Sequence, residues 1–166
     1  IAQRFNHHYG EILTLPEAVI DDATATLKGL DGRKMSKSYG NTIPLFEPPK
    51  RLRKLIMKIK TNSLEPGEPK DPDDSTLFDI YKAFASPSET EAMAAKFREG
   101  IAWGTAKQEL FEYIDARIAP ARAEYDRLIA DPGHVEQVLA DGAAKARSVA
   151  TPLMTRIREA IGLRAL

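Results

Sequence analysis

Residues 30–41 hold the residue types best suited to chemistry in this chain. These twelve residues, LDGRKMSKSYGN, contain three cations, two serines and two glycines. Lys34 and Lys37 are flexible point charges that can follow phosphate oxygens as charge moves between them, and Ser36 and Ser38 can donate hydrogen bonds to the same oxygens. Glycine lets the backbone approach a ligand closely. The stretch therefore predicts a mobile loop that closes over a polyphosphate; the alternative is a solvated basic turn.

The composition is that of an ordinary globular protein with an uneven distribution of charge. The chain has 166 residues, 43% of them hydrophobic and 29% charged, with no net charge. This length suffices for one core, or for one domain with a piece of another. Residues 28–60 contain ten Lys or Arg against two acidic residues. A polyanion should therefore meet the middle of the chain first.

Several classes of site are not expected. The chain has no cysteine, which excludes disulfides and thiolate metal sites and favours a reducing compartment. No apolar run approaches the roughly 20 residues of a membrane span. The adjacent His7 and His8 point about 100° apart on a helix, and Asp21 and Asp22 have no third ligand nearby, so no metal site is predicted. The chain begins at Ile1 without a leader, which suggests a fragment with no signal peptide.

The first part of the chain predicts one helix and two strands. Residues 1–10 form a helical pattern that stops at Gly10. Residues 12–15 resemble a short strand, ended by Pro16. Residues 23–30 resemble a second strand, which leads directly into the lysine-rich stretch. Ligands of open α/β sheets bind at the carboxyl ends of strands, so this placement suits an active-site loop.

The rest of the chain predicts helices joined by turns. A helix should follow Pro48 and Pro49, with an apolar stripe and six exposed basic residues. Its basic face is either simply solvated or a contact surface for an RNA backbone. Further helices are expected over 76–84, 87–98, 105–129 with a kink at Pro120, and 135–161, where apolar residues recur at i, i+3, i+4 and i+7. The acidic segment 62–75 should lack regular structure.

The lysine-rich stretch also carries a resemblance. Residues 34–38 read KMSKS, which resembles the signature loop of class I aminoacyl-tRNA synthetases. That motif, followed by Gly40 and Asn41, is typical of the class and does not define one amino acid. The flanking segments resemble the C-terminal half of a bacterial tryptophanyl-tRNA synthetase, and the resemblance covers nearly the whole chain; these segments are 1–6, 9–11, 59–63, 142–147 and 158–163.

The resemblance implies a mainly α structure in two parts. Residues 1–46 would be the remnant of a Rossmann-type α/β nucleotide-binding domain that includes the KMSKS loop, and residues 47–166 a helical bundle that recognises tRNA and its anticodon. The implied activity is ATP-dependent conversion of tryptophan to tryptophanyl-adenylate, followed by transfer to tRNA(Trp), in the cytoplasm. The implied partners are tRNA(Trp), tryptophan and ATP with its Mg²⁺, and the full-length enzyme would be a homodimer.

The resemblance also assigns site residues. Lys34 and Lys37 would be catalytic by stabilising the α-phosphate and the departing pyrophosphate, with Lys37 the first choice. The residues that bind ATP would be Lys34, Met35, Ser36, Lys37, Ser38 and Ala25, and the backbone near Ala25 would pack against the adenine.

Two features of the family are missing and leave alternatives open. The family has a second phosphate-binding signature related to His-Ile-Gly-His, and the three histidines of this chain, His7, His8 and His134, do not match it. Most of the amino-acid pocket is missing too, so the isolated chain is expected to be inactive. One alternative is a non-catalytic helical module that binds tRNA or a protein. Another is a tyrosine enzyme of the same class, although residues 142–163 argue against it.

Overall fold

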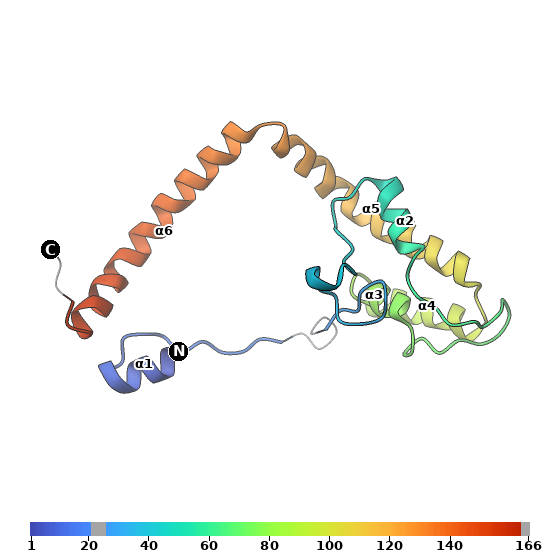
Figure 1. Ribbon diagram of the computed structural model, residues 1–166, viewed down its shortest axis with the longest axis horizontal. Coiled ribbons are helices and arrows are strands. Elements are labelled where there is room, and N and C mark those ends of the chain that lie inside the picture. The colour runs from blue at the N-terminus through green and yellow to red at the C-terminus, as the bar shows by residue number, and fades with distance from the viewer. Residues whose placement is uncertain (21–25, 164–166) are drawn as a thin grey trace. The chain divides into compact units, whose positions relative to one another are not determined.

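The fold is mainly helical. It was analysed in a computed structural model that describes residues 1–20 and 26–163 (Figure 1). Within those residues the backbone forms six α-helices and one short 3-10 helix, without a β-strand. The predicted mainly α class is therefore confirmed.

Three of the helices begin at a residue whose side chain caps the first turn. Ser75 accepts a hydrogen bond from the Phe78 amide at 3.3 Å, Ser86 forms a capping box with Glu89, and Asp131 accepts from the His134 amide at 3.1 Å. Each of these side chains satisfies an amide that the first turn leaves without a partner. The helices are α1 (Ala2–Tyr9), α2 (Pro49–Ile56), α3 (Thr76–Lys82), α4 (Pro87–Arg98), α5 (Trp103–Ile129) and α6 (Pro132–Ala160), and the 3-10 helix is η1 (Lys37–Tyr39).

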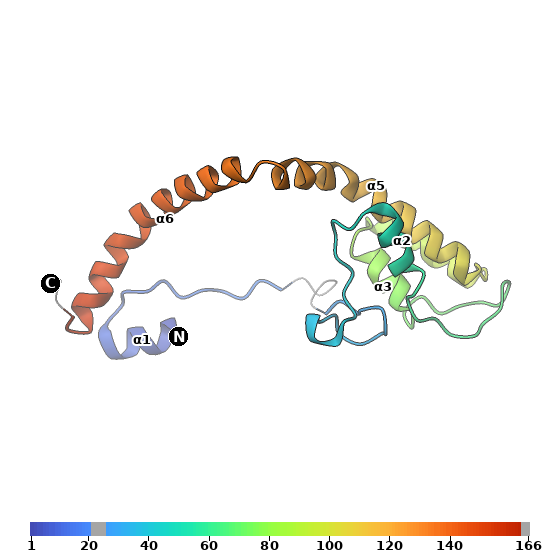
Figure 2. The ribbon, with the colours of Figure 1, turned by 45° about the horizontal axis from the view of Figure 1, so that its top comes forward.

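The chain divides into two compact units, and one of them contains the buried core. The first unit comprises residues 1–19 and 127–166, and the second comprises residues 20–126. In the second unit α2 and α3 lie beside the first part of α5 (Figures 1 and 2). Its most deeply buried side chains are Leu52, Ile56, Ile59, Leu77, Phe97 and Leu110. The domain boundary at residue 46 remains a prediction.

Aromatic contacts extend this core to the start of α5. The Phe97 ring lies edge-on to Phe78 with 5.5 Å between centroids, and edge-on to Trp103 at 5.6 Å. Such geometry is the favoured one for aromatic pairs. The indole N–H of Trp103 donates to Asn62 Oδ1 at 3.0 Å. The single tryptophan of the chain therefore joins the core to the start of the acidic segment.

Both predicted strands are wrong within the described residues. Residues 12–15 run without regular structure, and the described part of the second segment, residues 26–30, contributes a single isolated bridge between Lys28 and Lys34. A strand needs neighbouring strands to satisfy its backbone amides and carbonyls. The described residues supply none, so apolar patterning alone produces no sheet here.

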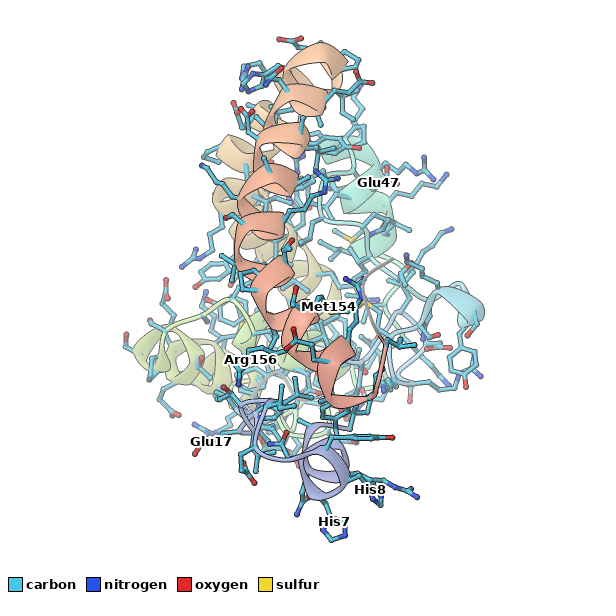
Figure 3. All side chains as sticks on the ribbon, turned by 90° about the vertical axis from the view of Figure 1, so that its left-hand side faces the viewer. His7, His8, Glu17, Glu47, Met154 and Arg156 are labelled. Atoms are coloured by element: carbon cyan, nitrogen blue, oxygen red, sulfur yellow. The ribbon has the colours of Figure 1, made fainter. Side chains whose placement is uncertain are left out.

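The two long helices cover the segments expected to be helical. α5 runs from Trp103 to Ile129 with Pro120 inside it, and the kink expected at Pro120 remains a prediction. α6 has the predicted apolar periodicity, but none of its residues within the described range is buried, and Val149 is 78% exposed. Met154 and Arg156 project from the same end of α6 (Figure 3). No helix of the described residues is both long and apolar enough to cross a bilayer.

We predict that the chain loses stability in acid as the Glu89 carboxylate, which belongs to the capping box of α4, becomes protonated. Hydrogen bonds from the Ser86 hydroxyl and amide lower the pKa of Glu89 from 4.5 to about 2. A lowered pKa in the folded state means that the stabilisation is complete above the unfolded pKa and is lost as the pH falls towards 2. Carboxyl NMR should report the Glu89 titration near that value.

Glu89→Gln removes the titrating carboxyl and tests this prediction by acid unfolding. It should flatten the dependence of unfolding free energy on pH between 4.5 and about 2. A Glu89 titration at the ordinary carboxyl value would contradict the capping assignment. Glu136, for which no capping bond is seen among the described residues, provides the control as Glu136→Gln.

Candidate nucleotide-binding loop

Residues 27–41, called the lysine loop below, form a small closed frame. The Met35 amide donates to the Leu27 carbonyl at 2.8 Å, and the Gly29 amide donates to the Arg33 carbonyl at 2.7 Å. Gly32 makes the turn between the two arms with a φ of 83°, a conformation that favours glycine. The short helix η1 follows and ends at Gly40, whose φ is 64°. The predicted polyphosphate loop thus has a defined backbone path.

Apolar contacts and two polar contacts anchor this frame on the helical core. Leu27, Leu30 and Ile43 pack against the buried core cluster. The Lys60 amide donates to the Leu30 carbonyl at 2.9 Å, and the Lys28 ammonium lies 2.9 Å from Asp79 of α3. The loop is therefore attached through its first arm and through the residues that follow it.

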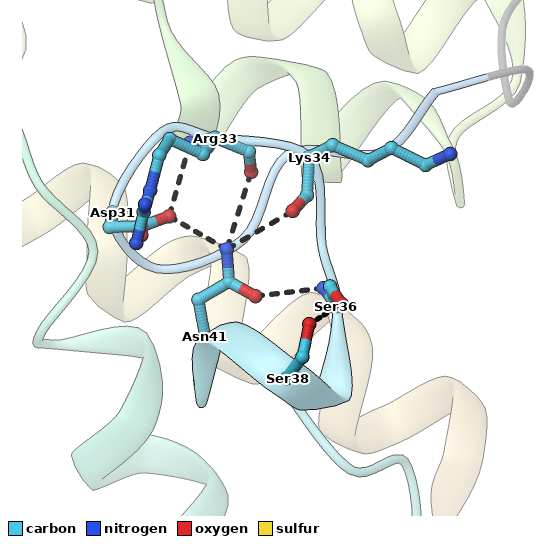
Figure 4. A network of polar contacts seen from close by, with 6 residues as sticks. All are labelled: Asp31, Arg33, Lys34, Ser36, Ser38 and Asn41. Carbon is cyan, nitrogen blue, oxygen red and sulfur yellow. Dashed lines mark hydrogen bonds and ion pairs between the residues drawn. The ribbon is translucent and has the colours of Figure 1, made fainter.

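Asn41 links the two arms of the lysine loop (Figure 4). Its side-chain amide donates to Asp31 Oδ1 at 2.7 Å and to the Lys34 carbonyl at 3.2 Å, and its Oδ1 accepts from the Ser36 amide at 2.8 Å. The residue is 3% exposed. A buried amide with its donors and acceptor satisfied holds its neighbours in a unique arrangement.

Asp31 and Arg33 form the charged edge of the same network. Arg33 Nη2 and Nε each lie 2.7 Å from Asp31 Oδ2, and the guanidinium stands 4.6 Å from the centre of the Tyr39 ring. The hydrogen bond from Asn41, followed by that from Arg33, lowers the pKa of Asp31 to about 2. Asp31 is therefore ionised at neutral pH and neutralises Arg33.

The two lysines of the loop remain available. Lys34 and Lys37 are exposed and make no ion pair within the described residues. In Figure 4 the Lys34 side chain extends away from the hydrogen-bonded network. The hydroxyls of Ser36 and Ser38 lie 2.8 Å apart. Two free ammonium groups beside two hydroxyls can bind the oxygens of a polyphosphate and follow a change in their charge.

The structure adds residues to the predicted site, and one predicted residue lies outside the described part of the chain. Lys34, Met35, Ser36, Lys37 and Ser38 share the loop as predicted, whereas Ala25 lies outside the described residues. No role is predicted from the sequence for Asp31, Asn41 or Gly29, which build the frame. The sequence signal for Asn41 is its place with Gly40 shortly after the KMSKS residues.

The basic face of α2 points to solvent, as predicted. Leu52 and Ile56 of the helix and Ile59 just after it are buried. Six basic residues are exposed, namely Lys50, Arg51, Arg53, Lys54, Lys58 and Lys60. Arg51 pairs with Glu47 at 3.2 Å, and Arg53 donates to Gln108 at 2.9 Å. The helix therefore combines a core-facing stripe with a basic surface that suits a phosphate backbone.

The described residues offer no cluster of three or more His, Asp or Glu side chains that could hold a metal ion. His7 and His8 project outward from α1 (Figure 3), and their ring centroids lie 5.1 Å apart. Their T-shaped ring contact is a surface feature of the helix end.

Comparison with known families gives one match that covers most of the chain. The family described as class I tRNA synthetases (W and Y) matches residues 1–119. This match agrees with the resemblance that the KMSKS residues indicated.

Curated relatives are similar over the whole chain. The tryptophan–tRNA ligase of Xanthomonas axonopodis pv. citri is 58% identical over 99% of this chain and 39% of its own length. The tryptophan–tRNA ligase of Neisseria meningitidis serogroup A is 53% identical over 100% of this chain and 49% of its own length. The chain thus spans about two fifths to one half of these relatives.

Solved structures agree with the sequence comparison. A crystal structure of tryptophanyl-tRNA synthetase from Campylobacter jejuni, complexed with ADP and tryptophan, superposes with a TM-score of 0.77 and 39% identity over 98% of this chain and 51% of its own. A second structure of the Campylobacter protein gives a TM-score of 0.75. The predicted resemblance to tryptophanyl-tRNA synthetases is confirmed.

We predict that Gly29→Ala disrupts the lysine loop. A Cβ at this position would lie 2.5 Å from the side-chain atoms and the carbonyl oxygen of Asn41, closer than such contacts allow. Asn41 would have to move, and the Ser36 amide would lose its partner. Hydrogen exchange should show faster exchange of the Ser36 amide by ~10-fold or more, equivalent to about 1.4 kcal/mol of local opening free energy.

Gly142→Ala in the interior of α6 is the control, because a Cβ there meets no atom within 4 Å. It should stabilise the chain by about 0.5–1 kcal/mol, the usual advantage of alanine in a helix. Unchanged Ser36 exchange in Gly29→Ala would rule out the close packing described for Asn41.

Proposed function

The chain belongs to the class I tRNA synthetases of the W and Y family, and from this membership we propose that it is part of a tryptophan–tRNA ligase. The observation that carries the proposal is the lysine loop, in which Asp31 neutralises Arg33 while Lys34 and Lys37 stay free. The similarity to tryptophan–tRNA ligases at 53–58% identity supports tryptophan as the amino acid.

The proposed reaction needs positioning and charge stabilisation more than covalent chemistry by the protein. The carboxylate of tryptophan attacks the α-phosphorus of ATP, tryptophanyl-adenylate forms, and pyrophosphate leaves; the aminoacyl group then passes to the 3′ end of tRNA(Trp). Lys37, with Lys34, stabilises the negative charge that develops on the phosphates. Ser36 and Ser38 donate hydrogen bonds to the same oxygens, Met35 shapes the loop, and Ala25 packs against the adenine. Mg²⁺ arrives bound to ATP.

The chain supplies one side of this active site. It spans about two fifths to one half of its curated relatives, and no histidine in it matches the second phosphate-binding signature of the class. We therefore expect activity only when the rest of the enzyme is joined to it. In that context we propose a homodimer in the cytoplasm, with tRNA(Trp), tryptophan and ATP as partners.

We predict that Lys37→Ala abolishes most of the activation step. The variant is made in a full-length ligase, in which the preceding portion of a curated relative is fused to Ile1. Removal of one preorganised charge should lower kcat for ATP–pyrophosphate exchange ~100- to 1,000-fold. Lys96→Ala is the control, because Lys96 lies on the surface of α4, where it pairs with Glu109 of α5. Exchange that survives Lys37→Ala would favour the non-catalytic binding module.

We propose that the basic face of α2, together with the basic residues just after the helix, contacts the tRNA backbone. Lys54 of α2 and Lys58 after its end are exposed and make no ion pair within the described residues. Each phosphate contact that is lost should lower the slope of log K against log salt by about 0.7–0.9. Lys54→Ala in the full-length ligase should therefore weaken tRNA(Trp) binding and flatten its salt dependence.

Arg98→Ala is the control for that measurement, because Arg98 is paired with Glu91 on α4. Binding should be followed by filter retention across a salt series. An unchanged salt slope in Lys54→Ala would show that this face of α2 is simply solvated.

A further inference from the structure

Asn41 occupies an unusual position in the lysine loop. Asn41 is 3% exposed, whereas most other residues of the loop are partly or fully exposed, and its backbone carbonyl accepts a bond from the Leu30 amide at 3.0 Å. Its side chain uses both its donor and its acceptor groups, as described above. An asparagine with this many bonds is hard to replace, because any other side chain leaves a buried group without a partner.

The side-chain bonds of Asn41 fall on the backbone on both sides of Met35, between the two lysines. The Lys34 carbonyl and the Ser36 amide flank Met35, so Asn41 holds the peptide segment that carries Lys34. Lys37 lies in η1, which runs between the Ser36 amide and Asn41 itself. One amide side chain therefore holds the backbone at Lys34 and at Ser36, directly before η1.

We propose that Asn41 is a positioning residue of the active site, which aligns Lys34 and Lys37 for the transfer of the nucleotidyl group by holding the KMSKS backbone against Asp31. The inference rests on the proposed function. Asn41 touches no reacting atom in this arrangement; it acts through the two lysines. Because a displacement of about 1 Å can cost ~100-fold in rate, a local loosening of this backbone should affect kcat more than the KM for ATP.

Paired substitutions at Asn41 and at its hydrogen-bond partner Asp31 test the proposal. Asn41→Asp places a carboxylate against the ionised Asp31 and removes the donor to the Lys34 carbonyl. Asp31→Asn alone is milder, because the new amide can turn its oxygen towards Asn41 Nδ2, at the cost of the ion pair with Arg33. In the double variant the amide at position 31 can donate to the carboxylate at position 41, while the Ser36 amide keeps an oxygen acceptor.

The three variants should be compared in the full-length ligase by ATP–pyrophosphate exchange. We expect Asn41→Asp to lower kcat ~10- to 100-fold, with a smaller change in the KM for ATP. The double variant should recover at least ~10-fold of that loss, which is a coupling that distant or independent sites do not show. An unchanged kcat in Asn41→Asp, or a double variant whose losses simply add, would overturn the proposal.

Hydrogen exchange of the Ser36 amide supplies a readout that does not depend on activity. It should accelerate in Asn41→Asp and recover in the double variant. Asn6→Asp is the matched control, because Asn6 is also buried and bonds through both ends of its amide, to the Ile12 and Leu13 amides, the Leu13 carbonyl and Glu11. That variant should leave the Ser36 amide unaffected.

The two readouts separate the two claims. If the unsubstituted full-length protein shows no exchange of ATP and pyrophosphate, the proposed function fails, and Ser36 exchange then decides whether Asn41 organises the loop. If the enzyme is active and Ser36 exchange in Asn41→Asp equals that of the unsubstituted protein, the positioning role fails while the function stands.

Discussion

A loop that binds phosphates must be held in place while its cations stay free, and the anchoring of the lysine loop meets this constraint. The loop is attached by apolar contacts of Leu27 and Leu30 with the core and by a backbone bond between Leu30 and Lys60. None of these anchors uses the ammonium groups of Lys34 and Lys37. The core built by α2 to α5 therefore supports the lysine loop without engaging either of these ammonium groups.

The lysines of the chain illustrate how burial separates structural from functional charge. Lys70 is 2% exposed, and its ammonium donates to the carbonyls of Glu65 and Glu68 at 2.9 Å each. It organises the irregular acidic segment from within, because these two hydrogen bonds help to offset the burial of the ammonium. Lys34 and Lys37 are chemically identical to it but exposed. Their free charge is what a polyphosphate can use.

Asp31 has two roles in the loop. Its carboxylate holds Arg33 and accepts from Asn41, so one of the three cations of the stretch serves the frame. The remaining two are directed to solvent. The hydrogen bonds from Asn41 and Arg33 lower the pKa of Asp31 to about 2, and the same Asn41 amide bonds the backbone at Lys34 and Ser36. One side chain therefore contributes to both the electrostatics and the backbone geometry of the loop.

Features that rest on near neighbours can be predicted from the sequence alone. Ser86 with Glu89 predicts the start of α4, Pro48 with Pro49 predicts the start of α2, and residues 34–38 identify the class of enzyme. These signals act within one turn or one short motif, so no distant partner is needed. The remaining features depend on contacts between distant parts of the chain. Residues 12–15 form no strand because no neighbouring strand meets them, and the apolar stripe of α6 is exposed because nothing in the described chain covers it. Asn41 acquired its role only when the fold brought Asp31, ten positions away, within hydrogen-bonding distance.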